Sequence, residues 1–580
     1  MIKDRLKKLR DLMGKNEIDA YLVDNADYHS SEYVKDYFKE RTFISSFDGS
    51  NGIALILKDS AYLWTDGRYF IQAEKDLKDT SITLMKMKEE GVPTLLEFIK
   101  ENLSSKVIGL NGYTSSYSLI KEIEETSTVK SEDDLIDEIW TTRPKFNLNN
   151  IYSLPLTLTG ESTQSKLIRL REKLEEKGAT SIFISSLDDN AWLFNLRGSD
   201  VKESLLFLSF SYITKDEAHL FLNIDSLNEA LKNNLKNHDI ILHEYSDVLS
   251  FLGKIKDEKI LLSKLRTSYG YVKLLENNNE IIDSILPTTL FKSIKNEVEI
   301  SNDIDIHKAD GLAVFRFMKY IKENHNKEEM DEYNLALKLR DLRKMDKRFI
   351  EVSFSTIASF KENAAIVHYA PSKESSKKVE GDGLFLLDSG GQYFGGTTDI
   401  TRTYSLGKIS ESMRHHYTLV LKGHIALANL EFEKGTKGYY MDSLARLPLK
   451  DEGLDYKHGT GHGIGYMLNV HEGPNAFRDS LESSEEIKEG TITSNEPGFY
   501  LEGEYGIRIE SEVLCVKKGD KLGFKTITYA PIDLEPIDIN LLTNQEKEWL
   551  NNYHKEVYNT LKDLIDDNEL EYLKIVTREI

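Results

Sequence analysis

Apolar and polar residues in the N-terminal half of the chain follow a pattern that occurs twice. Residues 9–12 have the spacing of an amphipathic helix and lead to the segment 19–23, which is apolar after Asp19. The same order recurs at 170–174 and 181–184. An amphipathic helix followed by a buried strand is typical of an α/β unit, and its repetition indicates two related α/β domains.

The length of the chain sets the number of domains. With 580 residues, it exceeds what a single hydrophobic core usually holds. We predict two related domains at 1–149 and 150–300, followed by a third domain at 301–580.

The end of the chain predicts a helical segment. Between Asn544 and Val576, apolar residues recur at three- and four-residue intervals, which is the spacing of one helix face. This face consists of Trp549, Leu550, Tyr553, Val557, Leu561 and Leu564. We assign it to packing rather than to binding.

Composition excludes some classes of function. Acidic residues outnumber basic ones by 97 to 75, and the formal net charge of −22 argues against nonspecific nucleic-acid binding. The one cysteine, Cys515, lies in an apolar run and is expected to fill the core. The first eight residues are amphipathic rather than signal-like, and no stretch reaches the roughly 20 apolar residues of a membrane span. We therefore expect a soluble, cytoplasmic protein.

Two aspartates in the C-terminal half are candidates for metal binding. Asp388 ends the apolar run 384–387, and an unpaired carboxylate in a buried strand would cost roughly several kcal/mol. Asp399 follows the glycine-rich segment 390–396. A hairpin through this segment would bring the two aspartates together, at a spacing that suits a shared cation.

Two glutamates extend this set. Residues 507–510 alternate with period two, which predicts that Arg508 and Glu510 lie on one face of a strand. Glu496 ends a similar segment just before Pro497, which favours an extended backbone. Two-metal hydrolases use such carboxylates to hold two cations about 3.5–4 Å apart around an activated water.

The segment 458–465 contributes an imidazole, His462. It has two histidines four residues apart, but four glycines in eight residues argue against a helical zinc motif, because each would cost about 1 kcal/mol in a helix interior. The glycines occupy alternate positions, which predicts an extended chain with close backbone approach on one side. The segment also lacks the glycine spacing of a dinucleotide-binding loop.

Each candidate also has an ordinary structural interpretation. Asp388 and Asp399 could be turn or capping residues, Glu496 could pair with Arg508, and a lone histidine is more often a hydrogen-bonded core residue. The five ligand-type residues together favour a metal centre. Oxygen-rich ligation with one imidazole and no thiolate favours Mn²⁺, with Co²⁺, Fe²⁺ and Zn²⁺ left open.

The strings around these residues resemble those of a known family. In order, they are 387–390, 398–403, 458–465, 471–474, 495–498 and 508–511. They resemble the signature of the pita-bread metallopeptidases and, more closely, that of the three-domain cytosolic Xaa-Pro aminopeptidases (aminopeptidase P). Strings at 64–70, 137–144 and 192–198 are similar to strings in the N-terminal domains of those enzymes.

This resemblance implies a fold and an activity. The fold class is α/β (α+β), with two creatinase-like N-terminal α/β domains followed by a pita-bread catalytic domain whose curved antiparallel sheet is backed by helices. The activity is hydrolysis of the N-terminal Xaa-Pro bond by a hydroxide held between two divalent metal ions. The partners are peptides with proline second, and a homodimer is expected.

The resemblance also implies residue roles. Asp388 would bind one ion, Asp399 and Glu510 would bridge both, and His462 and Glu496 would complete the shell of the other. Glu496 would carry a proton to the leaving nitrogen. The cleft histidines would orient the peptide and stabilise the oxyanion, and Arg508 would hold Asp388. The cleft histidines are His368, His458 and His471.

Proline requires a particular pocket, because an Xaa-Pro bond has no N–H and its ring fixes φ. Tyr500 and Val470 are the predicted apolar walls that would contact the ring. Three alternatives stay open: a prolidase that cuts only dipeptides, a methionine aminopeptidase, and a noncatalytic peptide-binding module of the same fold. The tandem N-terminal domains disfavour the first two, and the complete ligand set disfavours the third.

Overall fold

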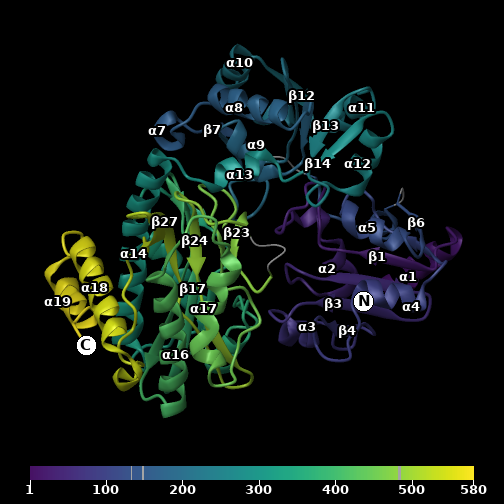
Figure 1. The fold of residues 1–580 in the computed structure, drawn as a ribbon. Coiled ribbons are helices and arrows are strands. Elements are labelled where there is room, and N and C mark those ends of the chain that lie inside the picture. Colours follow the sequence, from purple (N-terminus) through teal and green to yellow (C-terminus); the bar gives the residue numbers. More distant parts are fainter. Residues whose placement is uncertain (132–133, 147–148, 481–484) are drawn as a thin grey trace. The chain divides into compact units, whose positions relative to one another are not determined.

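A computed structural model describes residues 1–131, 134–146, 149–480 and 485–580, which form two compact units (Figure 1). Unit 1 comprises 1–155 and 161–288, and unit 2 comprises 156–160 and 289–580. Because unit 1 contains both predicted N-terminal domains, the boundary near residue 149 stays a prediction, as does the one near residue 300.

Unit 1 contains two six-stranded sheets with the same strand arrangement. The first has the order β4-β3-β2-β1-β5-β6 and the second the order β12-β11-β10-β8-β13-β14. In each, one central strand (β1 or β8) pairs antiparallel on one side and parallel on the other. An amphipathic helix, α1 or α8, precedes that strand. The repeated α/β pattern of the sequence is therefore confirmed.

The elements of the first sheet and its helices are α1 (Ile2–Lys15), β1 (Ala20–Val23), α2 (Glu40–Ser45), β2 (Ile53–Leu57), β3 (Ala61–Thr65), α3 (Phe70–Asp76), β4 (Thr83–Lys86), α4 (Leu95–Asn102), β5 (Val107–Gly109), α5 (Tyr117–Glu124), β6 (Thr128–Lys130) and α6 (Leu135–Ile139). Those that follow in unit 1 are β7 (Tyr152–Ser153), α8 (Thr163–Glu176), β8 (Ser181–Ile184), α9 (Leu187–Leu193), β9 (Leu196–Arg197), β10 (Phe210–Thr214), β11 (Ala218–Leu222), α10 (Glu229–Asn237), β12 (Ile240–Glu244), α11 (Val248–Leu252), β13 (Lys259–Leu262), α12 (Tyr269–Glu276) and β14 (Glu280–Asp283).

Unit 2 is built on antiparallel strands. Its largest sheet has the order β21-β28-β27-β24-β22-β23, and a second sheet has the order β16-β17-β20. The strands are β15 (Phe349–Val352), β16 (Ile357–Phe360), β17 (Gly383–Ser389), β18 (Gly391–Tyr393), β19 (Gly396–Thr397), β20 (Ile400–Leu406), β21 (Glu431–Phe432), β22 (Gly461–Gly463), β23 (Glu472–Phe477), β24 (Ile492–Asn495), β25 (Gly498–Leu501), β26 (Tyr505–Arg508), β27 (Ser511–Lys518) and β28 (Lys521–Thr526).

Unit 2 also contains long helices, several of which pack against these strands. They are α14 (Glu297–Asn324), α15 (Glu332–Arg343), α16 (Glu411–Ala428), α17 (Gly438–Lys450), α18 (Asn544–Leu561) and α19 (Asp567–Val576), with the short α7 (Leu156–Thr159) and α13 (Pro287–Ser293). Helix α14 begins with a capping box in which Asn296 and Glu299 satisfy each other's backbone N–H groups. In Figure 1, α18 and α19 (yellow) lie beside α14, and both helices contact it.

The C-terminal segment forms two helices rather than one. Helix α18 ends at Leu561, and a new capping box at Asp566 and Glu569 begins α19. Leu550, Tyr553, Val557 and Leu561 are buried, which agrees with the predicted packing role, whereas Leu564 lies between the helices and is 48% exposed. The spacing of apolar residues did not reveal the break between α18 and α19, because this spacing continues from one helix into the segment that joins them.

Core positions predicted from apolar runs are buried. The strand that ends at Asp388 contributes Leu384, Phe385 and Leu387 to the largest apolar cluster. Cys515 is fully buried among apolar residues, as predicted, and burial raises the pKa of its thiol to about 12. This sulfur is therefore a poor nucleophile at neutral pH.

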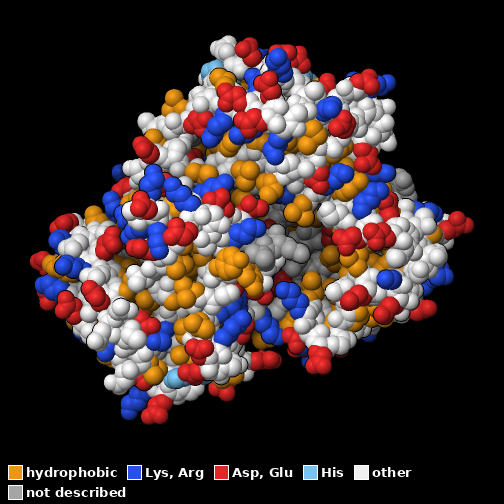
Figure 2. Space-filling model, in the orientation of Figure 1, with side chains coloured by type: hydrophobic (Ala, Val, Ile, Leu, Met, Phe, Trp, Pro, Cys, Tyr) orange, Lys and Arg blue, Asp and Glu red, His pale blue; other side chains and the backbone are white. Residues whose placement is uncertain are grey.

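The outer surface is mixed in charge. In Figure 2, acidic and basic side chains are interspersed over the visible face, so the net charge is spread over that face rather than gathered in one patch. Within the described ranges, no helix combines the length and apolar character that a membrane crossing needs.

Two helical glycines differ in their surroundings and so provide a test of the packing. A Cβ on Gly311 in α14 would lie 2.2 Å from the carbonyl oxygen of Tyr529, whereas a Cβ on Gly14 in α1 would meet nothing within 4 Å. Alanine favours a helix by about 1 kcal/mol over glycine, but overpacking costs about 1–3 kcal/mol. We expect Gly311→Ala to lower the thermal unfolding midpoint by a few degrees and Gly14→Ala to leave it unchanged or higher. A midpoint unchanged in Gly311→Ala would contradict the close packing of α14.

Candidate metal centre

Two paired strands bring the candidate aspartates together. Asp388 lies at the end of β17 opposite Thr401 of β20, and Asp399 immediately precedes β20. The antiparallel pairing predicted from the glycine-rich segment is confirmed. At Gly390, a Cβ would lie 1.8 Å from the carbonyl oxygen of Thr398, so only glycine allows the two strands to approach this closely.

The remaining candidates come from the larger sheet. His462 is in β22, and Glu496 lies between β24 and β25. A Cβ on Gly461 would lie 2.0 Å from the carbonyl oxygen of Ser494, and one on Gly463 would lie 2.3 Å from that of Glu472. The close backbone approach predicted for this glycine-rich segment is therefore confirmed.

The predicted strand through Glu510 is wrong in part. Strand β26 ends at Arg508 and β27 begins at Ser511, so Ile509 and Glu510 form the link between two strands. The Glu510 N–H donates to the carbonyl oxygen of Thr401 at 3.0 Å. The Thr401 hydroxyl donates to Glu510 Oε2 at 2.7 Å, so contacts with Thr401 rather than strand alternation place the Glu510 backbone and side chain.

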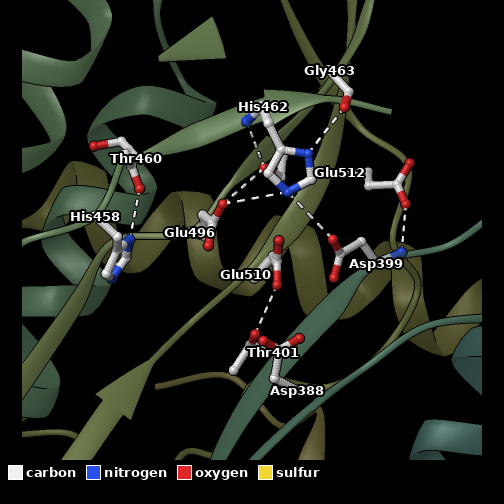
Figure 3. Close-up of polar contacts among 12 residues, drawn as sticks. Asp388, Asp399, Thr401, His458, Thr460, His462, Gly463, Glu496, Glu510 and Glu512 are labelled. Atoms are coloured by element: carbon white, nitrogen blue, oxygen red, sulfur yellow. Dashed lines mark hydrogen bonds and ion pairs between the residues drawn. The ribbon is translucent and has the colours of Figure 1, made fainter. Parts of the chain in front are cut away.

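The side chains of all five candidates converge (Figure 3). Asp388, Asp399 and Glu510 each offer one oxygen atom, and these atoms lie within 4.8 Å of one another. His462, Glu496 and Glu510 form a second group by the same measure, and Asp399 and His462 form a third with His471. Because Glu510 and Asp399 each belong to two groups, the arrangement suits two neighbouring ions.

Several atoms of this cluster fit metal ligation. Asp388 Oδ1 and Glu510 Oε1 are buried and have no hydrogen-bond partner among the described residues. His462 Nδ1 lies 3.0 Å from the carbonyl oxygen of Gly463, which directs Nε2 toward Asp399 Oδ2 at 3.4 Å and Glu496 Oε1 at 3.5 Å. Metal-binding histidines commonly have this second hydrogen bond, so the donor set fits a dinuclear centre.

The electrostatics of the cluster show why cations are needed. Burial raises the pKa of Asp388 to about 6, with Asp399 adding to the shift and Arg508 opposing it. Burial and the neighbouring carboxylates raise the pKa of Glu510 well above its usual range. Burial would lower the pKa of His462, but Asp399 and Glu496 outweigh it and raise the value to about 9. Without positive charge between them, these carboxylates destabilise one another.

A polar chain runs from Asp388 to His458. Arg508 Nη2 donates to Asp388 Oδ2 at 2.5 Å, and Arg508 Nη1 donates to the Tyr500 hydroxyl at 2.6 Å. The same hydroxyl lies 2.8 Å from His458 Nε2. The contact between Arg508 and Asp388 is the one that the sequence analysis expected.

The two residues predicted to form the proline pocket lie in different surroundings. Tyr500 packs its ring beside Ile357 and Leu386, but its hydroxyl belongs to the polar chain. Val470 is 1% exposed and packs with Ile464 in the core. Their contact with a proline ring stays a prediction, and the burial of Val470 does not favour it.

The other two cleft histidines lie close to this cluster. The rings of His471 and His462 are 4.2 Å apart. His368 is half-buried, and the preceding residue, Val367, accepts a hydrogen bond from Arg508 Nη2 at 3.4 Å. The segment before His368 is held by a residue that the sequence analysis missed, Glu332 of α15.

Glu332 is a buried carboxylate that gathers donors from this segment. It accepts hydrogen bonds from the Phe360 N–H, the Asn363 side-chain amide, the Tyr369 hydroxyl and the Lys377 N–H at 2.7 to 3.0 Å. No local sequence pattern indicates the role of Glu332, because the groups that donate hydrogen bonds to its carboxylate lie 28 to 45 positions further along the chain. It shapes the segment that presents His368.

Comparisons with known proteins agree with this geometry. A model of metallopeptidase family M24 matches residues 305–517, and one of the C-terminal region of that family matches 520–580. Models of the Creatinase/Prolidase N-terminal domain match 5–139 and 142–299. A probable Xaa-Pro aminopeptidase P from Laccaria bicolor is 38% identical over 598 residues, which cover 98% of this chain and 92% of the relative. The chain belongs to metallopeptidase family M24.

Two further proteins resemble this M24 metallopeptidase over its full length, and another resembles part of it. Aminopeptidase P1 from Arabidopsis thaliana is 35% identical, with 99% of both chains covered. The structure of the X-prolyl aminopeptidase from Caenorhabditis elegans, described as a cytosolic enzyme with a di-nuclear active site, matches with a TM-score of 0.95 at 32% identity over 100% of both chains. The Xaa-Pro dipeptidase from Bacillus anthracis matches 64% of this chain with a TM-score of 0.53 at 23% identity, a likeness of fold alone. The predicted fold class is confirmed.

The carboxylate cluster predicts a pH-dependent stability in this M24 metallopeptidase. In the metal-free folded protein, Asp388 and Glu510 have raised pKa values, whereas unfolded Asp and Glu have pKa values of about 3.9 and 4.3. The folded state thus binds protons that the unfolded chain has released, so the contribution of these groups to stability falls as pH rises through the raised pKa values. Chelator-treated protein should therefore melt lower as pH is raised to 7.5, and added metal, which binds the folded state, should raise the melting temperature at that pH.

Glu510→Gln isolates this effect. The amide can keep the hydrogen bond with Thr401 Oγ1, which lies 2.7 Å from Glu510 Oε2, but it removes a carboxyl group whose charge the neighbouring carboxylates repel. In chelator-treated protein at pH 7.5, we expect the variant to melt above the wild type. With added Mn²⁺ the order should reverse, because the variant has lost a ligand. Differential scanning fluorimetry measures both, and a chelator-treated variant that melts below the wild type would contradict the proposed repulsion.

Proposed function

We propose that the chain is an Xaa-Pro aminopeptidase, which hydrolyses the first peptide bond of peptides with proline at the second position. The observation that carries this proposal is the convergence of Asp388, Asp399, His462, Glu496 and Glu510 into two overlapping ligand groups. Full-length similarity to relatives named Xaa-Pro aminopeptidase P and aminopeptidase P1 supports the substrate class.

The five residues would hold two divalent ions, with Mn²⁺ favoured by the oxygen-rich donor set. When bound, such ions polarise the scissile carbonyl and lower the pKa of a water molecule so that it can attack at neutral pH. Asp399 and Glu510 would bridge the two positions, Asp388 would complete one, and His462 and Glu496 the other.

Glu496 is the proposed proton carrier. Burial raises its pKa, while His462 and Arg508 oppose that shift, so the carboxylate is poised to accept and release a proton. Ser494 Oγ donates to Glu496 Oε1 at 3.2 Å and helps to orient it. Glu496 would take a proton from the attacking water and deliver it to the proline nitrogen as the peptide bond breaks.

The three cleft histidines would act on the substrate. His458 is oriented by the Tyr500 hydroxyl, and His471 by its position against His462. Together with His368, they would donate hydrogen bonds to the peptide and to the oxyanion that develops on the scissile carbonyl. The acidic cluster also suits the free α-amine of the substrate, which would restrict cleavage to the first residue.

Location and assembly are part of the same proposal. We propose a cytoplasmic enzyme, because the Caenorhabditis elegans neighbour is described as cytosolic. We also propose a homodimer and the three domains 1–149, 150–300 and 301–580, with the metal centre in the third.

The activity can be tested on a short peptide. The purified protein should release free arginine from Arg-Pro-Pro when Mn²⁺ is supplied, and chelation should abolish release. Glu496→Gln should lower kcat by roughly 10²–10⁴-fold, because general acid–base catalysis contributes about that much. Glu504→Gln, at an exposed turn in the same region, is the matched control. Cleavage of Ala-Pro without cleavage of Arg-Pro-Pro would instead indicate a prolidase, and inactivity on both with every metal would indicate a binding module.

Tyr500→Phe separates two roles of Tyr500. The substitution keeps the ring, which was predicted to contact proline, and removes the hydroxyl that joins His458 to Arg508. If the hydroxyl orients His458, kcat should fall about tenfold or more, with little change in KM. Unchanged kcat would leave the ring as the functional part of Tyr500.

A further inference from the structure

A second group of ligand-type side chains lies apart from the five residues assigned above. Asp303 and His307 are one turn apart on α14, and Glu512 is in β27. Each is almost fully buried, with exposures of 2%, 2% and 0%. Each offers one oxygen or nitrogen atom within 4.8 Å of the others. Such a set of buried polar residues requires an explanation.

The atoms that converge in this cluster make few contacts with other polar groups. Among the described residues, Asp303 Oδ1, His307 Nε2 and Glu512 Oε2 make no hydrogen bond of good geometry, and the one ion contact between them is that of Nε2 with Oε2 at 3.2 Å. The same condition holds for Asp388 Oδ1 and Glu510 Oε1 at the metal centre. Leaving a buried polar atom without a partner is costly, and a cation would contact all three at once.

The imidazole of His307 is arranged like that of His462. His307 Nδ1 lies 2.8 Å from the carbonyl oxygen of Asp303, so this nitrogen donates its proton and Nε2 is directed into the cluster. Nε2 lies 3.2 Å from Glu512 Oε2. At His462, the corresponding distance to Asp399 Oδ2 is 3.4 Å. Ligand atoms about 2.0–2.2 Å from one tetrahedral ion have separations of this size.

Charge also favours a cation. When both carboxylates are ionised, the two carboxylates and the imidazole carry a net negative charge whether or not the imidazole is protonated. Lys295 adds a positive field at Asp303, but its ammonium group is paired with Glu472 at 2.7 Å. A buried negative charge that remains uncompensated is costly, and a divalent ion would neutralise it.

We propose that Asp303, His307 and Glu512 bind a third divalent metal ion, separate from the dinuclear centre. The mixed nitrogen and oxygen donors without a thiolate suit Zn²⁺ or Mn²⁺. The ion has a structural role, because its ligands are buried and it joins helix α14 to strand β27. It is also linked to the dinuclear centre, since Glu512 Oε1 accepts the Asp399 N–H at 2.7 Å (Figure 3).

Anomalous diffraction tests this site directly. Crystals of the full-length protein, reconstituted with Mn²⁺ and Zn²⁺, would be measured on both sides of each absorption edge. We expect an anomalous peak between Asp303, His307 and Glu512. Density without such a peak would overturn the proposal, whether or not the dinuclear centre is occupied, so the result does not depend on the proposed function.

Metal content provides a second test. Only the expected total of three ions per chain rests on the proposed dinuclear centre. His307→Gln, which changes none of the five proposed ligands, should bind one metal equivalent fewer per chain than the wild type by inductively coupled plasma mass spectrometry. Asp305→Asn is the matched control, because Asp305 is on the same helix with a 54% exposed side chain. Equal metal content in both variants would overturn the proposal.

Glu512→Gln covers the case in which His307→Gln does not fold. The amide oxygen can still accept the Asp399 N–H, so this variant keeps that hydrogen bond and removes the charged ligand. It should also lose one equivalent, and an unchanged metal content would count against the site. If the three residues form only an ion-paired network, both variants will retain the metal content of the wild type.

Discussion

The catalytic unit depends on one electrostatic constraint. Asp388, Asp399, Glu496 and Glu510 are close together in a largely buried region, and burial raises the pKa values of Asp388, Glu496 and Glu510. Such an arrangement is stable at neutral pH only if positive charge lies among the carboxylates. Arg508 supplies one positive group, at Asp388. In the metal-free protein a protonated His462 supplies another, and bound cations would supply more, so metal binding and the stability of the unit are coupled.

The scaffold meets this constraint by bringing two sheets into close contact. Arg402, which is buried, donates to the carbonyl oxygens of Glu510, Ala530 and Pro531 and to the Tyr553 hydroxyl. It therefore joins β20 to the segment after β28 and to α18. Glycines at 390, 461 and 463 allow backbones to approach where any Cβ would clash. The ligands are thus held by backbone geometry that side-chain motion cannot easily disturb.

At the site, local sequence signals predicted strand pairing and close backbone approach better than the orientation of individual side chains. The aspartates and the glycine-rich segment of His462 were placed correctly, because strand pairing and close backbone approach follow from local signals. Glu510 was assigned to a strand that ends two residues earlier, since its orientation depends on a hydrogen bond with Thr401. The hydrogen bonds of the Tyr500 hydroxyl were not predicted. Its partners are His458 and Arg508, and no helical or strand periodicity in the sequence connects Tyr500 with these two residues.

By itself, the sequence determined the repeated α/β units, the antiparallel strands and the set of residues able to bind metal, because these depend on side-chain type and on periods of two to four residues. Only the tertiary structure decided which polar residues meet. Asp303 and His307 lie on one face of α14 together with apolar residues. Their partner Glu512 lies 205 residues after His307 in the sequence. Glu332 likewise acts on a distant segment. The physical reason is that burial and charge balance are properties of the packed molecule, and contacts between distant segments leave no local pattern.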